Sequence, residues 1–193
     1  LIIRRPPGSV LALTLSHYTA LFRPLSARCK PAAGSPSGET WRAVLSLRED
    51  GRVRSVGVSN FHVHHLTRII DEFGVVPVVD QVELHPWLPQ SELRAFAAQH
   101  DILIEAWSPL ASGNLIDDPQ LAAIGAKYGK TAAQVMVRWH LELGNVVLPK
   151  SVTPERIRQN IDVFDFGLDE EDFSVIATLE SGRRTGPNPD EFM

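Results

Sequence analysis

Cysteine is nearly missing from this sequence, since Cys29 is the only one among 193 residues. A lone cysteine excludes a disulfide framework and a cysteine-based metal site, and it indicates a reducing compartment, for which we expect the cytoplasm. Long apolar runs are missing too, because none approaches the roughly 20 residues that a helix needs to cross a bilayer. The opening LIIRRPPGSV lacks the long apolar core of a signal peptide, so we interpret it as a fragment or a mis-joined end rather than a targeting sequence.

The sequence has no large excess of either charge. Its formal net charge of −4 gives no reason to expect a nucleic acid as partner. Apolar residues at 44% and charged residues at 22% are ordinary for a globular protein, and a chain of this length can bury a core. The composition therefore predicts a single globular domain that binds neither nucleic acid nor membrane.

The pattern of residues along the sequence changes at about residue 40. Residues 1–39 hold five prolines, and KPAAGSPSGE is loop-like throughout, so we expect an irregular segment there. In residues 40–193, short apolar strands alternate with amphipathic helices in four successive strand–helix units. The predicted strands lie within 52–60, 75–84, 102–110 and 145–151, and the predicted helices lie within 40–51, 61–74, 89–100, 118–129, 131–144, 154–164 and 169–181.

This alternation indicates an α/β protein whose parallel sheet is covered by helices. An open doubly wound sheet and a closed barrel both satisfy it. No Gly-x-Gly-x-x-Gly follows a predicted strand, so the dinucleotide fingerprint of the open sheet is missing. Polar residues instead collect at the carboxyl ends of the strands, which in a barrel share one mouth. We therefore predict a (β/α)8 TIM barrel, of which these four units supply about the C-terminal half.

Four residues at the predicted strand ends are candidates for ligand contacts. Ser59 and Asn60 in GVSN either bind a ligand or cap the helix that follows. Gln81 lies among valines, where an unpaired amide is costly, so it needs partners from the protein or from a ligand. Trp107 is either an ordinary core residue or a flat platform for an aromatic ring.

The stretch VVLPKSVTPERIRQN joins an apolar strand to a helix. Thr153 fits the helix cap and Pro154 the first helical position, and a helix N-terminus attracts anions. Arg158 lies about 200° around the helix from Arg156, so these two should not act together. The predicted anion pocket comprises Lys150, Ser151, Thr153 and Arg156, with Gln159 and Asn160 one turn further along the same face. The alternative is a solvated basic turn with an ordinary cap.

Three histidines, His62, His64 and His65, begin one predicted helix. His62 and His65 are three residues apart and can share a face, but the sequence suggests no third ligand. We therefore expect no metal site. Two further histidines, His85 and His140, are expected to be packed polar residues rather than catalysts.

Four motifs occur in a fixed order: GVSNF, DQVELHPWLPQ, EAWSPL and VVLPKSVTPERIRQNIDVFDFGL. They resemble the C-terminal half of the aldo-keto reductases, and within that family the diketogluconate-reductase-like branch, over about residues 40–193. The resemblance implies a barrel that binds NADPH or NADP across its mouth and reduces aldehydes and ketones to alcohols. It also implies a small-molecule carbonyl substrate and a monomer in the full-length form. One departure is Asp80, where the family usually has Asn.

The resemblance assigns cofactor contacts to residues at these motifs. The residues that match contacts to the nicotinamide are Ser59, Asn60 and Gln81 for its carboxamide and Trp107 for its ring. Ser108 and Leu110 match residues along the pyrophosphate. The residues that match the 2′-phosphate pocket are Lys150, Ser151, Thr153 and Arg156, with Gln159 and Asn160 near the adenine.

Catalysis in this family requires groups from its earlier strands. A Tyr donates the proton, helped by a Lys and an Asp, and a His orients the carbonyl. The Tyr, Lys and Asp have no counterpart in residues 1–39, whereas LALTLSHYT is similar to the strand that ends in the His and makes His17 the candidate for that place. General acid catalysis contributes about 10²–10⁴-fold, so a chain without the Tyr loses most activity. The alternative is therefore a catalytically inactive fragment or relic that keeps at most partial NADPH binding.

Overall fold

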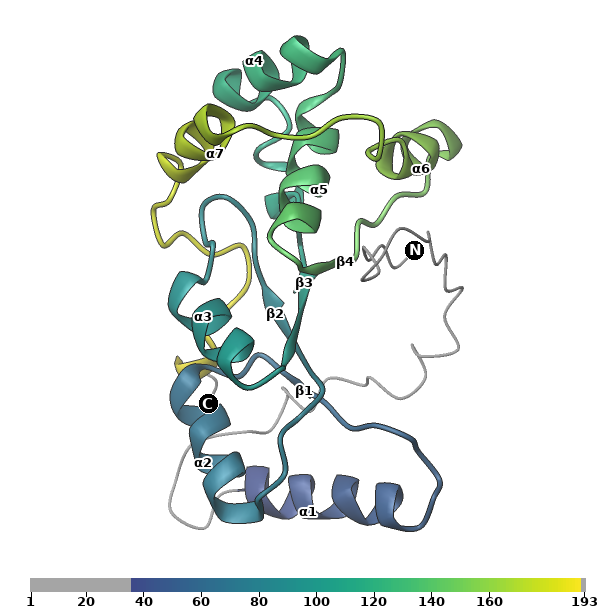
Figure 1. Ribbon diagram of the computed structural model, residues 1–193, viewed down its shortest axis with the longest axis vertical. Helices are drawn as coiled ribbons and strands as arrows, with labels where there is room; N and C mark the ends of the chain where they lie inside the picture. The colour runs from purple at the N-terminus through teal and green to yellow at the C-terminus, as the bar shows by residue number, and fades with distance from the viewer. Residues whose placement is uncertain (1–35, 192–193) are drawn as a thin grey trace. The chain divides into compact units, whose positions relative to one another are not determined.

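The computed structural model describes residues 36–191 and confirms the α/β class. In this part of the chain, four short strands form one parallel sheet in the order β1-β2-β3-β4, accompanied by seven α-helices (Figure 1). This arrangement is consistent with part of a TIM barrel. The candidate catalytic residue His17 and most of the segment 1–39 lie outside the described residues. None of the described helices is long and apolar enough to cross a membrane.

The described chain divides into two compact units. The first unit comprises residues 36–82, 90–104 and 186–191, and the second comprises residues 83–89 and 105–185. Two strands, β2 (Val79–Glu83) and β3 (Leu103–Trp107), run from the first unit into the second.

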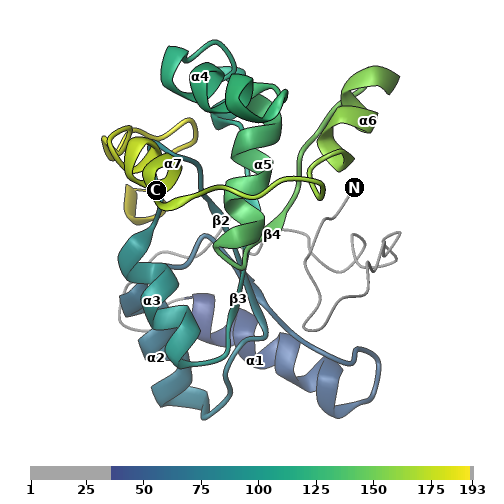
Figure 2. The same cartoon turned by 45° about the horizontal axis from the view of Figure 1, so that its top comes forward.

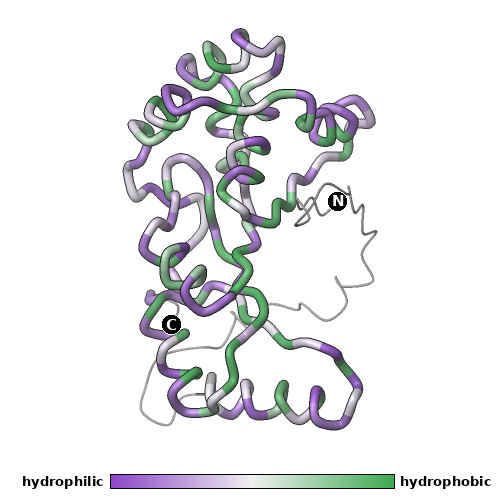
Figure 3. The backbone as a smooth tube through the Cα atoms, viewed as in Figure 1, coloured by the Kyte–Doolittle hydropathy of each residue, from purple (hydrophilic) through white to green (hydrophobic). Residues whose placement is uncertain are grey.

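The first unit contains three helices, of which α2 contacts the other two, and strand β1. Its complete elements are α1 (Pro36–Glu49), β1 (Val58–Ser59), α2 (Val63–Phe73), α3 (Ser91–Gln99) and the 3-10 turn η3 (Pro189–Glu191). Helix α2 contacts both α1 and α3. Along α1 the colour alternates between apolar green and polar purple in Figure 3, and its apolar face buries Trp41 and Leu45. Helix α2 ends at Gly74, whose φ of 63° favours glycine and whose N–H donates to the carbonyl of Ile70.

The second unit is organised around one buried helix, α5 (Ala132–Glu142). Its other elements are η2 (Ala111–Gly113), α4 (Pro119–Tyr128), β4 (Val146–Val147), α6 (Pro154–Ile161) and α7 (Glu170–Ala177). Helix α5 contacts α4, β4 and α6, as Figure 2 shows from a second direction. Val137 and Leu141 of α5 form a fully buried cluster with Val147 of β4 and Val163, which follows α6. The chain is therefore tied to the core on both sides of α6.

Every predicted strand is shorter in the structure, and two boundary differences have a clear local cause. Helix α1 begins at Pro36, four residues before the predicted start, so the end of the segment expected to be irregular is helical. Proline suits the first position of a helix because its missing N–H has no intrahelical acceptor there. The predicted strand 52–60 shrinks to Val58–Ser59 because the amides of Arg52 and Val53 donate to the carbonyl of Leu47 and so close the end of α1.

Candidate cofactor site

A cleft of about 590 Å³ lies in the second unit beside α6. Its walls come from the segment after β3, from the segment after β4 and from one face of α6. Eight of the residues selected from the sequence line it: Ser108, Leu110, Lys150, Ser151, Thr153, Arg156, Gln159 and Asn160. Arg158 does not line it, which agrees with its predicted position on another face of α6.

The electrostatics of this cleft suit an anion. Lys150 and Arg156 are exposed, and no carboxylate in residues 36–191 forms an ion pair with either of them. Thr153 occupies the N-cap of α6 as predicted, but its hydroxyl caps no backbone amide. Its own N–H instead donates to Oγ of Ser151 at 3.2 Å. Two unpaired cations thus adjoin a helix N-terminus, whose partial positive charge adds to theirs.

Helix α6 is exposed along most of its length, and its C-terminal end is anchored to the preceding helices. Nε2 of Gln134 donates to the backbone carbonyl of Asp162 at 2.7 Å. Nζ of Lys130 lies 2.9 Å from the Asp162 carboxylate and 2.8 Å from the Asp165 carboxylate. Hydrogen bonds to Asp165 and Asp162 raise the pKa of Lys130, so it remains a cation. These contacts, with the burial of Val163, fix where α6 leaves the cleft.

The opposite wall of the cleft has an unusual backbone. Ser108, Ala111 and Ser112 have φ values of 54°, 50° and 55°, in the left-handed region that non-glycine residues seldom adopt. The Ser108 hydroxyl holds this loop, since Oγ of Ser108 accepts the N–H of Ser112 at 3.0 Å and lies 2.9 Å from its hydroxyl. Strained backbone of this kind occurs disproportionately at ligand sites. Ser112 was missed from the sequence, although the small residues of SPLASGN are a signal for a tight loop.

In the first unit, Ser59 and Asn60 at the end of β1 lie beside Gln81 in the middle of β2. Ser59 and Gln81 are opposite each other in the strand register. Oγ of Ser59 and the N–H of Asn60 both donate to the backbone carbonyl of Gln81, each at 2.9 Å. The N-cap of α2 is His62, so the interpretation of Ser59 or Asn60 as the cap of that helix is wrong. Asn60 instead has φ of 59° and turns the chain out of the strand.

Asp80 is fully buried beside this group. Its Oδ1 accepts the N–H of Phe61 at 3.4 Å, and its Oδ2 has no hydrogen-bond partner within the described residues. Burial raises the pKa of this carboxyl to about 8, because the low-dielectric interior disfavours the charged form. At neutral pH the group is therefore mainly uncharged, like the Asn that the resemblance leads one to expect here.

The remaining aromatic and imidazole candidates fall in the second unit. Trp107 ends β3 and is half-buried, but it does not line the cleft. His85 and His140 have no exposed surface. His85 Nε2 lies 3.1 Å from Oε1 of Glu83, and His140 Nε2 lies 3.3 Å from the carbonyl of Pro109, as expected of packed polar residues.

Comparison with known proteins gives one consistent result. The model of the Aldo/keto reductase family matches residues 29–181. The chain is similar to an aldo-keto reductase of Mycolicibacterium smegmatis, with 55% identity over 154 residues that cover 80% of this chain and 56% of that protein. It is similar to the methylglyoxal reductase DkgA of Escherichia coli K12, with 50% identity over 156 residues that cover 80% of this chain and 57% of that protein. A variant of the protein Gox0644, solved in complex with NADPH, has 47% identity and a TM-score of 0.76 and is matched over 80% of this chain and 57% of its own. The chain thus spans little more than half the length of the relatives that it matches.

Proposed function

The chain belongs to the aldo/keto reductase family, and we propose that it carries the NADPH-binding half of an enzyme that reduces aldehydes and ketones to alcohols. The observation that supports this most is the cleft beside α6, which is lined by eight of the residues selected from the sequence, among them Lys150 and Arg156, which form no ion pair within residues 36–191. A similar chain, the Gox0644 variant, was solved in complex with NADPH.

The 2′-phosphate of NADPH is the anion that we assign to Lys150 and Arg156. The planar guanidinium of Arg156 can pair with two phosphate oxygens at once, and the ammonium of Lys150 adds a point charge. Ser151 supplies a hydroxyl at the same N-terminus. Because NADH lacks this phosphate, the arrangement predicts a preference for NADPH.

The other cofactor contacts are assigned unit by unit. In the first unit, the amides of Asn60 and Gln81 and the hydroxyl of Ser59 match the hydrogen-bonding needs of the nicotinamide carboxamide. In the second unit, we assign Trp107 to stacking on an aromatic ring and the Ser108 loop to the pyrophosphate. When bound, the cofactor supplies a hydride to the carbonyl carbon of the substrate, and a proton must reach the carbonyl oxygen.

Cofactor affinity tests this proposal directly. We expect NADPH to bind the chain, measured by calorimetry, and Arg156→Ala to weaken binding by about tenfold to 100-fold, since a hydrogen bond to a charged group contributes about 1.5–3 kcal/mol. Arg158→Ala is the matched control, because it removes the same group from another face of the same helix. Both substitutions should leave the affinity for NADH nearly unchanged, because NADH lacks the 2′-phosphate. Failure of NADPH to bind at high micromolar concentration, or equal losses in the two variants, would refute the assignment.

A second candidate function is cofactor binding without turnover. It is favoured by the sequence, in which the family's Tyr, Lys and Asp have no counterpart. Methylglyoxal, which the name of the DkgA relative indicates as its substrate, is a suitable probe. Oxidation of NADPH in the presence of methylglyoxal, followed by its absorbance, would support the reductase. Tight NADPH binding with no oxidation above background would support the non-catalytic alternative.

A further inference from the structure

Three imidazoles in the first unit converge on one carboxylate. His62, His64 and His65 come from the N-terminus of α2, and Asp190 comes from η3, 128 positions beyond His62. Nδ1 of His62 lies 2.9 Å from Oδ2 of Asp190. Nε2 of His64 and Nε2 of His65 lie 3.4 Å and 3.5 Å from Oδ1 of the same residue. One nitrogen or oxygen from each of the four lies within 4.8 Å of those from the other three.

These separations are those of ligands around a common ion. Two ligand atoms at about 2.0–2.1 Å from a tetrahedral zinc ion lie roughly 3.3 Å apart. The separations of Asp190 from His62 and from His64, 2.9 Å and 3.4 Å, lie on either side of that value, and the nitrogens of the two rings lie within 4.8 Å of each other. An ion can also reach the site from solvent, because the side chain of His64 is 58% exposed.

The hydrogen bonds distinguish His65 from the other two rings. Nδ1 of His65 lies 3.1 Å from the backbone N–H of His62 and accepts it. A neutral imidazole that accepts at Nδ1 carries its proton at Nε2, so the His65 proton faces Asp190 and not an ion. Nε2 of His65 is buried, lies 3.5 Å from Oδ1 of Asp190 and forms no hydrogen bond within the described residues, so this ring lies beside the carboxylate without binding it. Nδ1 of His62 is hydrogen-bonded to Asp190 at 2.9 Å, so a bound ion would replace the proton between them, and Nε2 of His64 is the second nitrogen that faces the carboxylate.

We propose that His62 Nδ1, His64 Nε2 and the Asp190 carboxylate bind a divalent transition metal, with zinc as the principal candidate. Imidazole and carboxylate together suit zinc, whereas magnesium and calcium prefer oxygen ligands. Water completes a tetrahedral site with three protein ligands. The sequence led us to expect no metal because no third ligand lies near these histidines in the chain. The fold supplies it from η3.

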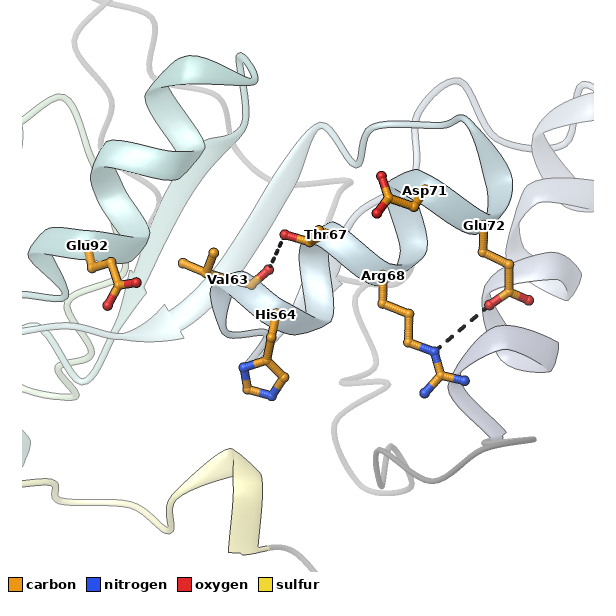
Figure 4. Close-up of a pocket in the computed structure, with 7 residues that line it drawn as sticks. All are labelled: Val63, His64, Thr67, Arg68, Asp71, Glu72 and Glu92. Carbon is orange, nitrogen blue, oxygen red and sulfur yellow. Dashed lines mark hydrogen bonds and ion pairs between the residues drawn. The ribbon is translucent and has the colours of Figure 1, made fainter.

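The neighbouring charges do not oppose a cation at this place. In Figure 4, His64 projects from the first turn of α2, and Arg68, one turn further on, extends toward Glu72. Nε of Arg68 lies 4.0 Å from Oε2 of Glu72. Asp71 and Glu92 line the same shallow surface hollow as His64, so acidic side chains outnumber the single arginine there. The site shares no residue with the cleft beside α6, and the proposal does not depend on NADPH binding.

Zinc titration of the full chain, stripped of metal with a chelator, tests the proposal. With a coloured zinc indicator as competitor, we expect one equivalent of zinc to bind the unmodified chain. His64→Ala and Asp190→Asn should each lower the zinc affinity by at least about tenfold, since changes to outer partners alone cost about 10–100-fold. His100→Ala is the matched control, because it removes a histidine of the same unit that stacks on Phe96 outside the cluster.

Cobalt provides a second readout that does not rely on affinity. The visible spectrum of the cobalt-loaded chain should be that of a tetrahedral ion with nitrogen and oxygen ligands, and His64→Ala should abolish it while NADPH binding is retained. His64 and Asp190 are partly exposed, so neither variant removes a buried group. No stoichiometric zinc binding, or zinc binding that Asp190→Asn leaves unchanged, would overturn the proposal.

Discussion

The hydroxyl of Thr185 donates to the carboxylate of Glu83 at 2.6 Å, although 102 positions separate the two residues. The backbone N–H of Thr185 donates to the same oxygen, and the Glu83 side chain has no exposed surface. Oγ of Thr185 also lies 3.2 Å from Oγ of Ser108, which holds the strained wall of the cleft. A buried carboxylate in β2 thus fixes a tail residue, and the tail residue fixes the proposed pyrophosphate loop.

Replacing Thr185 by valine should therefore affect both stability and cofactor binding. Thr185→Val keeps the shape but removes one hydrogen bond to Glu83 and the acceptor for Ser108, and we expect a loss of about 1 kcal/mol in the free energy of unfolding. Urea denaturation measures this, and calorimetry should show weaker NADPH binding. Thr178→Val is the control, because the Thr178 hydroxyl is exposed and, within residues 36–191, donates to Gln120 and to the carbonyl of Val175, away from the cleft residues. Equal effects of the two substitutions on stability and NADPH affinity would contradict the proposed link from Glu83 through Thr185 to Ser108.

The buried carboxyl of Asp80 should make stability depend on pH. Its pKa is raised to about 8 in the folded protein, so folding retains a proton that the unfolded chain releases near pH 4. The associated stability is fully present below pH 4 and is lost as the pH rises to about 8. Each pKa unit corresponds to about 1.4 kcal/mol, so the loss reaches several kcal/mol.

Asp80→Asn should remove this loss. Relative to the unmodified chain, the variant should gain in free energy of unfolding as the pH rises from 4 to 8, measured by urea denaturation across that range. Asp71→Asn, on the exposed face of α2, controls for the change in net charge. A difference between Asp80→Asn and the unmodified chain that stays constant with pH would show that Asp80 keeps its ordinary pKa.

Gly125 marks a close approach between α4 and the start of α5. A Cβ atom at this position would clash with the backbone carbonyl oxygen of Lys130. Because this oxygen belongs to the backbone, it cannot move aside as the end of a flexible side chain could. We expect Gly125→Ala to destabilise the protein by about 1–3 kcal/mol, as overpacking of a core typically does. In Gly167→Ala the nearest atom would be a carboxylate oxygen at 3.4 Å, so its effect should stay within about 0.5 kcal/mol. Thermal unfolding of the two variants compares them, and similar midpoints would contradict the expected clash.

The ion pairs of Lys130 with Asp162 and Asp165 should stabilise the position of α6 and slow its local unfolding. Lys130→Met removes both ion pairs and keeps the apolar stem, so we expect amide hydrogen exchange in α6 to quicken a few-fold and NADPH to bind more weakly. Lys127→Met is the matched control, because Lys127 pairs with Asp169 and Asp172 at α7 instead. Mass spectrometry of exchange resolves the two helices. Faster exchange confined to α7 in both variants would exclude a role for Lys130 at the cleft.

The sequence predicted the fold class and most elements, because apolar periodicity and capping patterns are local. The start of α7 is one example, since Asp169 and Asp172 three residues apart form a capping box in which each carboxylate accepts the other residue's backbone N–H. Thr153 was placed correctly at the N-cap, yet its hydroxyl caps no backbone amide, because a cap hydrogen bond depends on a side-chain rotamer that a sequence pattern does not specify. The predicted strand 52–60 was too long because two of its amides close the end of α1.

The same distinction between local sequence patterns and tertiary contacts holds for the candidate sites. The sequence by itself determined that Lys150, Ser151 and Arg156 share a strand–helix junction and that Arg158 faces elsewhere, since helical periodicity fixes both. Only the tertiary structure decided that Asp80 is buried with a raised pKa, that Thr185 reaches Glu83, and that Asp190 joins His62 and His64. Each of those outcomes depends on contacts between residues far apart in the chain or on the low dielectric of the interior. The spacing of residues along the sequence predicts neither the contacts nor the dielectric.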